Sequence, residues 1–154
     1  MDRFLIDTVS PQDELKALLD SNGVNHSDDA EGVRFILEEG AYKWETVCRY
    51  SRTAVLIYGI YPFETQQGGE IMESLNKING KLIRGSMILS GGRVMMRTSA
   101  DLYDVYGAYE AIARAIEYNA GAIVKFWQAI HSIDTKQGFS IKQRTEIRKE
   151  EAPY

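Results

Sequence analysis

The fold is decided by residues 87–130, which read MILSGGRVMMRTSADLYDVYGAYEAIARAIEYNAGAIVKFWQAI. Two short segments with strand-like alternation, residues 86–90 and 93–99, meet across the glycine pair Gly91-Gly92. Glycine pairs favour the tight turns that join antiparallel strands, so this stretch predicts a β-hairpin. A long segment with helical periodicity follows the hairpin. A hairpin that leads into an amphipathic helix is typical of an α+β domain, in which the helix covers one face of an antiparallel sheet.

The helical segment carries two neighbouring stripes. Bulky residues recur at about one helical turn and are expected to cover the sheet; they are Val105, Tyr109, Ile112, Ile116, Ile123, Trp127 and Ile130. A seam of small residues lies beside them, formed by Ala108, Ala111, Ala115, Ala122 and Ala129. Short side chains let another helix approach closely, and this helix is either the first helix of the same chain or part of a second subunit in a homodimer. Gly121 is expected to mark a bend, because glycine is unfavourable inside a helix.

The residues before the hairpin predict further elements. Ser10-Pro11 has the form of a helix start and Asn22-Gly23 that of a helix end. The acidic stretch of residues 25–32 is expected to be a solvated loop, since its oxygens do not follow the spacing of an EF-hand calcium loop. The elements expected after it are strands at residues 33–38, 42–50 and 53–61 and a short helix at residues 69–79.

The strand at residues 53–61 is apolar on both faces and is therefore expected to be central, with Pro62 ending it. The predicted fold is an α+β antiparallel sheet of about five strands with helices packed against it, in the order α-β-β-β-α-β-β-α. Residues 1–133 are expected to form one domain. Residues 134–154 are expected to form a charged, partly disordered tail.

Composition narrows the classes of function. The chain has 154 residues and a formal net charge of −4, which disfavours nucleic acid as a partner because phosphate binding needs a clustered basic surface. No apolar run approaches the roughly 20 residues that span a bilayer, and the first residues lack the apolar core of a secretory signal. One cysteine excludes an internal disulfide. These features predict a cytoplasmic protein with no membrane partner.

Candidate catalytic groups are sparse. Cys48 would be a nucleophile only if His26 or His131 reached it, and its inward register in a strand predicts a buried, inert thiol instead. Two histidines and one cysteine, far apart in sequence, do not predict a zinc site. We therefore expect no enzyme activity, no metal and no cofactor.

Two kinds of binding surface remain open. Tyr42 and Trp44 are large aromatic residues on a strand that is expected near the sheet edge, where an extended partner protein would gain both backbone pairing and aromatic contact. Core packing is the alternative for both residues. A small-molecule site or an active site between the sheet and its helices is the other possibility, with a polar lining of Tyr58, Arg97, Tyr103 and Tyr106.

The order of elements, together with SLNKIN at residues 74–79 and RVMMRTS at residues 93–99, resembles the YbjN-like family. These proteins share the fold of class I type III secretion chaperones, and the resemblance covers about residues 10–133. It implies a small, acidic, non-enzymatic bacterial protein that often dimerises. The secretion chaperones bind extended segments of effector proteins, whereas YbjN-like members are named as regulators of sensory transduction without an established activity. The charged stretch after Ile133 departs from the family.

The resemblance carries over no catalytic residue, because the family has no catalytic motif. The expected function is a non-enzymatic protein-interaction module, chaperone-like or regulatory, that binds another polypeptide of unknown identity. A secretion chaperone dedicated to one effector is one alternative. A small-molecule binder or enzyme is the other.

Overall fold

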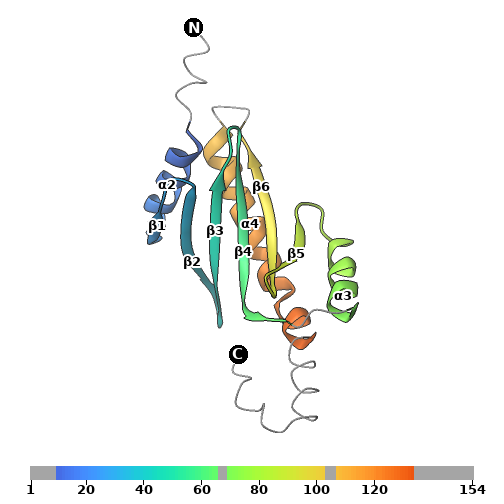
Figure 1. The fold of residues 1–154 in the computed structure, drawn as a ribbon. Coiled ribbons are helices and arrows are strands. Elements are labelled where there is room, and N and C mark those ends of the chain that lie inside the picture. The colour runs from blue at the N-terminus through green and yellow to red at the C-terminus, as the bar shows by residue number, and fades with distance from the viewer. Residues whose placement is uncertain (1–9, 66–68, 103–106, 134–154) are drawn as a thin grey trace.

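The computed structural model describes residues 10–65, 69–102 and 107–133 (Figure 1). Within these residues, six strands form one antiparallel sheet in the order β1-β2-β3-β4-β6-β5. The strands are β1 (His26–Asp28), β2 (Gly32–Glu39), β3 (Tyr42–Tyr50), β4 (Ala54–Glu64), β5 (Ser86–Ser90) and β6 (Arg93–Asp101). The helices are α2 (Pro11–Ser21), α3 (Gly69–Asn79) and α4 (Ala108–Lys125). The predicted α+β class is confirmed.

The sheet has one strand more than the prediction of about five, because β1 lies in the acidic stretch that was expected to be a loop. Its three residues are mostly exposed, so they show no apolar alternation that would reveal a strand. The strand forms because Asp29 shapes the turn into β2, where its carboxylate accepts hydrogen bonds from the backbone N–H groups of Glu31 at 2.8 Å and Gly32 at 2.9 Å.

Helix α2 starts and ends where the sequence predicts. The side chain of Ser10 accepts a hydrogen bond from the backbone N–H of Asp13 at 3.3 Å, and Asn22 forms the C-terminal cap. Three leucines on one face of the helix, Leu15, Leu18 and Leu19, are buried. They pack α2 against α4 at one end of the sheet.

Strand β4 is interior, between β3 and β6, as expected of the central strand. The expectation that Pro62 ends this strand is wrong, because β4 continues to Glu64. The pairing with β6 is irregular between Ile60 and Glu64, and Pro62 is exposed at this irregularity. Proline is tolerated at such positions because the ladder there does not need its missing N–H.

The helices cover one face of the sheet. In Figure 1, α4 crosses behind the strands while α2 and α3 lie toward opposite ends. The covered face of β4 buries Val55 and Ile57 completely, whereas Leu56 and Tyr58 on the other face are only half-buried. The two-sided apolar character of this strand therefore reflects one packed face and one uncovered face.

Helix α4 breaks at Phe126, and residues 127–133 are helical again. The expected bend at Gly121 is wrong, because Gly121 lies inside the regular part of the helix. The break has a local cause: the buried Tyr61 hydroxyl donates a hydrogen bond to the carbonyl of Ile123 at 2.8 Å, and a side chain that occupies a helical carbonyl favours an interruption there.

Most of the bulky stripe faces the sheet as expected, with Ile112, Ile123 and Ile130 fully buried. Tyr109 is an exception, since it is 39% exposed and its hydroxyl lies 2.9 Å from that of Ser21 in α2. Val105 lies outside the described residues.

The core consists of two apolar clusters. Between them lies Asn119 of α4, which is 1% exposed and donates hydrogen bonds to the carbonyls of Ile57 at 3.1 Å and Met96 at 2.9 Å. The helix can approach the sheet here because β4 has glycine at position 59, where an added Cβ would lie 2.4 Å from the Asn119 side-chain oxygen.

Candidate functional site

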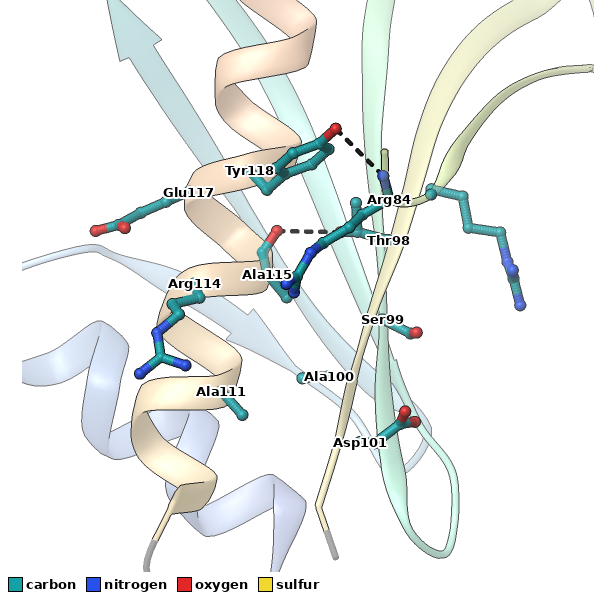
Figure 2. A pocket seen from close by; sticks show the side chains of 12 residues that line it. Arg84, Thr98, Ser99, Ala100, Asp101, Ala111, Arg114, Ala115, Glu117 and Tyr118 are labelled. Atoms are coloured by element: carbon teal, nitrogen blue, oxygen red, sulfur yellow. Dashed lines mark hydrogen bonds between the residues drawn. The ribbon is translucent and has the colours of Figure 1, made fainter. Parts of the chain in front are cut away.

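A groove of about 870 Å³ lies between β6 and α4 (Figure 2). Its lining includes the last four residues of β6, Thr98, Ser99, Ala100 and Asp101. Successive side chains of a strand point to opposite faces of the sheet. A groove that touches all four residues must therefore run along the edge of the strand. The remaining lining residues are Arg84, Gly85, Arg97, Ala111, Arg114, Ala115, Glu117 and Tyr118.

The edge is free because β5 covers only part of β6. The pairing between the two strands runs from Ser90 opposite Arg93 to Ser86 opposite Arg97, and β6 continues for four residues beyond that point. On its other side, β6 pairs with β4 as far as Asp101 opposite Ala54. Among the residues that the structure describes, the end of β6 therefore has a neighbouring strand on one side only.

The register identifies the free backbone groups. Leu102 donates its N–H to the carbonyl of Thr53 at 2.7 Å, and the hydrogen-bonded positions of an antiparallel ladder alternate along the strand. Ala100 and Thr98 therefore direct their backbone groups toward β4, whereas Ser99 and Asp101 direct theirs toward the groove. Their N–H and C=O groups form the kind of open edge to which another strand can add.

The segment before β5 is held away from this edge by Tyr118 of α4. The Tyr118 hydroxyl accepts hydrogen bonds from the backbone N–H groups of Ile83 at 3.0 Å and Arg84 at 3.2 Å. Gly85 then lies against β6, where an added Cβ would be 2.2 Å from the carbonyl oxygen of Arg97. Its φ of +69° is a conformation that glycine adopts most readily. Gly85 therefore marks the boundary between the covered and the free parts of β6.

The floor of the groove is made of small side chains. Ala100 is 3% exposed and Ala115 is 9% exposed, and the half-buried Ala111 lies one turn before Ala115 on α4. The hydroxyl of Thr98 donates to the carbonyl of Ala115 at 3.1 Å and fixes the distance between helix and strand. Three methyl groups leave room for a larger side chain from a ligand.

Charged side chains surround this floor. Figure 2 shows Arg84 between the strand and the helix, while Arg114 and Glu117 extend from α4 away from β6. Arg114 pairs with Glu110 at 3.4 Å, but both side chains are more than 70% exposed, and such pairs are weak. Arg84 makes no ion pair with the described residues.

The outer edge of β5 is closed by a side chain. Asn79 of α3 donates its amide N–H to the carbonyl of Met87 at 3.1 Å and accepts the Met87 N–H at 2.7 Å. The amide thus occupies the place of a neighbouring strand at this residue.

A second groove, of about 780 Å³, follows the part of β2 that β1 leaves uncovered. Ile36 at this edge is 50% exposed. Charged pairs stand beside it, Arg34 with Glu45 at 3.2 Å and Glu38 with Lys43 at 3.5 Å. Charged side chains of this kind discourage pairing with another strand.

His26 connects β1 to α2. Its ring nitrogens bond the carboxylate of Asp20, at 2.8 Å, and that of Asp28, which Lys16 also approaches at 3.5 Å. Both ring nitrogens face acceptors, so the protonated imidazolium fits this site best. Hydrogen bonds to Asp20 and then Asp28 raise the pKa of His26, and the bond to His26 lowers the pKa of Asp28.

The two aromatic residues that were predicted to bind a partner differ in how deeply they are buried. Trp44 is 2% exposed and packs edge-on against Trp127, so this structure places it in the core rather than on a contact surface. Tyr42 is half-buried, stacks on Trp127 with ring centroids 4.5 Å apart, and accepts a hydrogen bond from Gln128 at 2.9 Å.

The five alanines of the seam also differ in how deeply they are buried. Ala108, Ala115 and Ala122 are buried within the chain, and Ala115 belongs to the cluster formed with the leucines of α2. Ala111 is half-buried and Ala129 is exposed. A subunit contact through these two residues stays a prediction.

The candidate catalytic groups Cys48, His26 and His131 do not converge in the structure, whereas two of the residues predicted to line a small-molecule site, Tyr58 and Arg97, lie together away from the helices. Cys48 is fully buried, and burial raises the pKa of its thiol to about 12. His131 packs against Phe63 in the other cluster, and His26 bonds carboxylates. Arg97 donates to the Tyr58 hydroxyl at 3.2 Å on the uncovered face of the sheet. Tyr103 and Tyr106 lie outside the described residues. Among the residues that are described, no group of histidine, cysteine and acidic side chains could hold a metal ion, and no helix could span a membrane.

Sequence reasoning missed the edge groove. One signal was present, because the hairpin was predicted with five residues in the first strand and seven in the second. Unequal strands leave an overhang, but the overhang is a groove only because α4 runs beside it at a distance set by alanines.

Comparison with known proteins supports the fold. No protein-family model and no curated protein sequence matches the chain. Among solved structures, the chain is similar to the one described as "Crystal structure of YbjN, a putative transcription regulator from E. coli", with a TM-score of 0.55 and 12% sequence identity. The similarity covers 74% of this chain and 89% of that one. The chain therefore has a YbjN-like fold.

Proposed function

We propose that this protein is a non-enzymatic interaction module that binds an extended segment of another polypeptide along the free edge of β6. The observation that carries the proposal is the free edge itself, where Ser99 and Asp101 direct their backbone groups into a groove of about 870 Å³. An added strand would bond these groups and place alternate side chains against α4.

The function is regulatory or chaperone-like in kind. YbjN, which has a similar fold, bears the name of a regulator. A module without its own chemistry acts on another protein by binding it, and a strand edge recognises extended segments largely through their backbone. This mode of binding suits both a regulator and a chaperone.

The test removes one backbone donor. Ser99→Pro deletes the N–H that points into the groove and leaves the ladder with β4 intact, because proline is tolerated on a free strand edge. Ser99→Ala is the matched control, since it changes the side chain and keeps the N–H. A displayed library of random nine-residue peptides is selected against the full chain, and binding of the selected peptides to each variant is measured by fluorescence anisotropy.

We expect selected peptides to bind the unmodified protein and Ser99→Ala alike and to lose about tenfold in affinity on Ser99→Pro, which corresponds to about one hydrogen bond with its desolvation. Thermal unfolding verifies that both variants fold. Peptides that bind all three proteins equally, or a selection that enriches none, would contradict the proposal.

A further inference from the structure

The geometry of the groove restricts the segment that it accepts, and this inference rests on the proposed function. All the strand pairs of the described sheet are antiparallel, and β5 already runs antiparallel to β6. A segment that pairs with Ser99 and Asp101 in the same sense continues the line of β5. Its chain then runs from the Asp101 end of the groove toward Gly85.

The register fixes which side chain points inward. Residues directly opposite each other in an antiparallel pair have their side chains on the same face. Ala100 faces α4, so the residue opposite Ala100 also points toward α4. There it meets the methyl groups of Ala100, Ala111 and Ala115, which form an apolar floor with room above it. A large apolar side chain fits this position.

Gly85 already occupies the place opposite Thr98, so a bound segment leaves the ladder after the residue opposite Ser99. The residue two positions after the apolar one therefore lies at this closed end of the groove.

Two cations line this end, Arg84 and Arg97; Arg97 donates to the Tyr58 hydroxyl on the uncovered face of the sheet, which leaves Arg84 as the cation on the side of α4. The bond from its N–H to Tyr118 fixes its backbone, and its guanidinium has no ion-pair partner among the described residues. An arginine whose backbone is fixed and whose guanidinium has no ion-pair partner favours binding of a carboxylate.

We infer that the bound segment runs antiparallel to β6 and carries a large apolar residue opposite Ala100, followed two positions later by an aspartate or glutamate that pairs with Arg84. The opposite direction of binding would place the acidic residue before the apolar one. The order of the two residues therefore reports the direction of the strand.

The test repeats the peptide selection on charge-reversed protein. The library is selected against the unmodified chain, against Arg84→Glu and against Arg52→Glu, an exposed arginine in the turn between β3 and β4 that serves as the matched control. Unmodified protein and Arg52→Glu should enrich an apolar residue followed two places later by an acidic one. Arg84→Glu should enrich a basic residue at that place and bind the acidic peptides about tenfold more weakly.

A second variant tests the floor. Ala111→Leu fills the groove from the helix side, so the enriched residue at the inward position should change from large to small. Thermal unfolding of each variant verifies the fold.

The outcomes separate this inference from the proposed function. Peptides that depend on the Ser99 N–H but show no acidic preference, or keep that preference on Arg84→Glu, overturn the inference and leave the proposed function standing. Peptides with the acidic residue before the apolar one overturn the direction. A selection in which no peptide depends on Ser99 overturns both.

Discussion

The outer edge of β5 and the free end of β6 are neighbouring edges of one sheet. A side chain closes the first, whereas the second faces a groove. At β5, the Asn79 amide bonds both the N–H and the carbonyl of Met87. At β6, the backbone groups of Ser99 and Asp101 face a groove instead. Unpaired edges invite aggregation, and proteins commonly cover them. The proposed binding of another polypeptide would explain why this edge stays open beside a closed one.

We expect the largest effect on the free energy of unfolding from a substitution at Gly85, which marks the boundary between the two edges. Gly85→Ala would place a Cβ 2.2 Å from the Arg97 carbonyl oxygen, at a residue with a φ of +69°. Conformational strain and displacement of the backbone together should lower the free energy of unfolding by about 3 kcal/mol. Urea denaturation measures it.

Gly40→Ala is the control for this substitution. Gly40 has a similar φ of +62°, but an added Cβ would meet nothing within 4 Å. It should therefore cost only the conformational part, about 1 kcal/mol. Equal losses at the two glycines would show that Gly85 does not press against β6.

Removing the closure of β5 should have the next largest effect. Asn79→Ala leaves the backbone groups of Met87 without their partners, which should cost about 2 kcal/mol of unfolding free energy and increase aggregation. Asn76→Ala, on an exposed face of the same helix, is the control and should cost less than about 0.5 kcal/mol. If the two variants were equally stable in urea, the amide would not be closing the edge.

The segment between α3 and β5 should respond to Tyr118→Phe. This variant removes the hydroxyl that accepts the N–H groups of Ile83 and Arg84, at an exposed site where a hydrogen bond contributes about 1 kcal/mol or less. We expect faster amide exchange at these two residues and a small change in melting temperature. Unchanged exchange at both would mean that the hydroxyl does not hold this segment away from the groove.

We expect the smallest effect on stability from the histidine of β1, the strand at the edge of the sheet opposite β5. Because the pKa of His26 is raised above 6.5, its stabilising contribution is fully present below pH 6.5 and is lost as the pH rises through the higher pKa of the folded state. Because the pKa of Asp28 is lowered from 3.8, its contribution is present above pH 3.8 and is lost as the pH falls through the lower folded value.

The His26 contribution should therefore be largest between about pH 4 and pH 6.5 and decrease toward pH 8. Urea denaturation of the unmodified protein and of His26→Gln across this range measures the difference. A difference in stability that stays constant from pH 5 to pH 8 would rule out a protonated His26 between the two carboxylates.

Local patterns were sufficient to predict most of the fold. The bounds of β3 and α3 agree with the expectation because each has a complete period of apolar residues and a clear turn or cap at its end. Strand β1 and the continuation of β4 through Pro62 escaped prediction, because three polar residues show no period and proline is normally a strand breaker.

The candidate site was harder to predict because it depends on distances between elements. Trp44 was expected at a contact surface because its strand was placed near the sheet edge, with core packing as the alternative. The expected edge position is wrong, because β3 lies between β2 and β4, and Trp44 packs against Trp127 after the break in α4. The same alanine pattern that suggested a subunit contact gives the groove its floor. Which of these roles an alanine has depends on the neighbour opposite it, and a single sequence does not identify that neighbour.

The most direct test of the account is amide hydrogen exchange, followed by NMR on the full chain with and without a selected peptide. We predict that the amides of Ser99 and Asp101 exchange freely in the unbound protein, while those of Ala100, paired with β4, and Met87, closed by Asn79, are protected. Addition of the peptide should protect Ser99 and Asp101 and leave Met87 unchanged. Protection of Ser99 and Asp101 in the unbound protein, or free exchange at both after the peptide has bound, would contradict an open edge that receives another polypeptide.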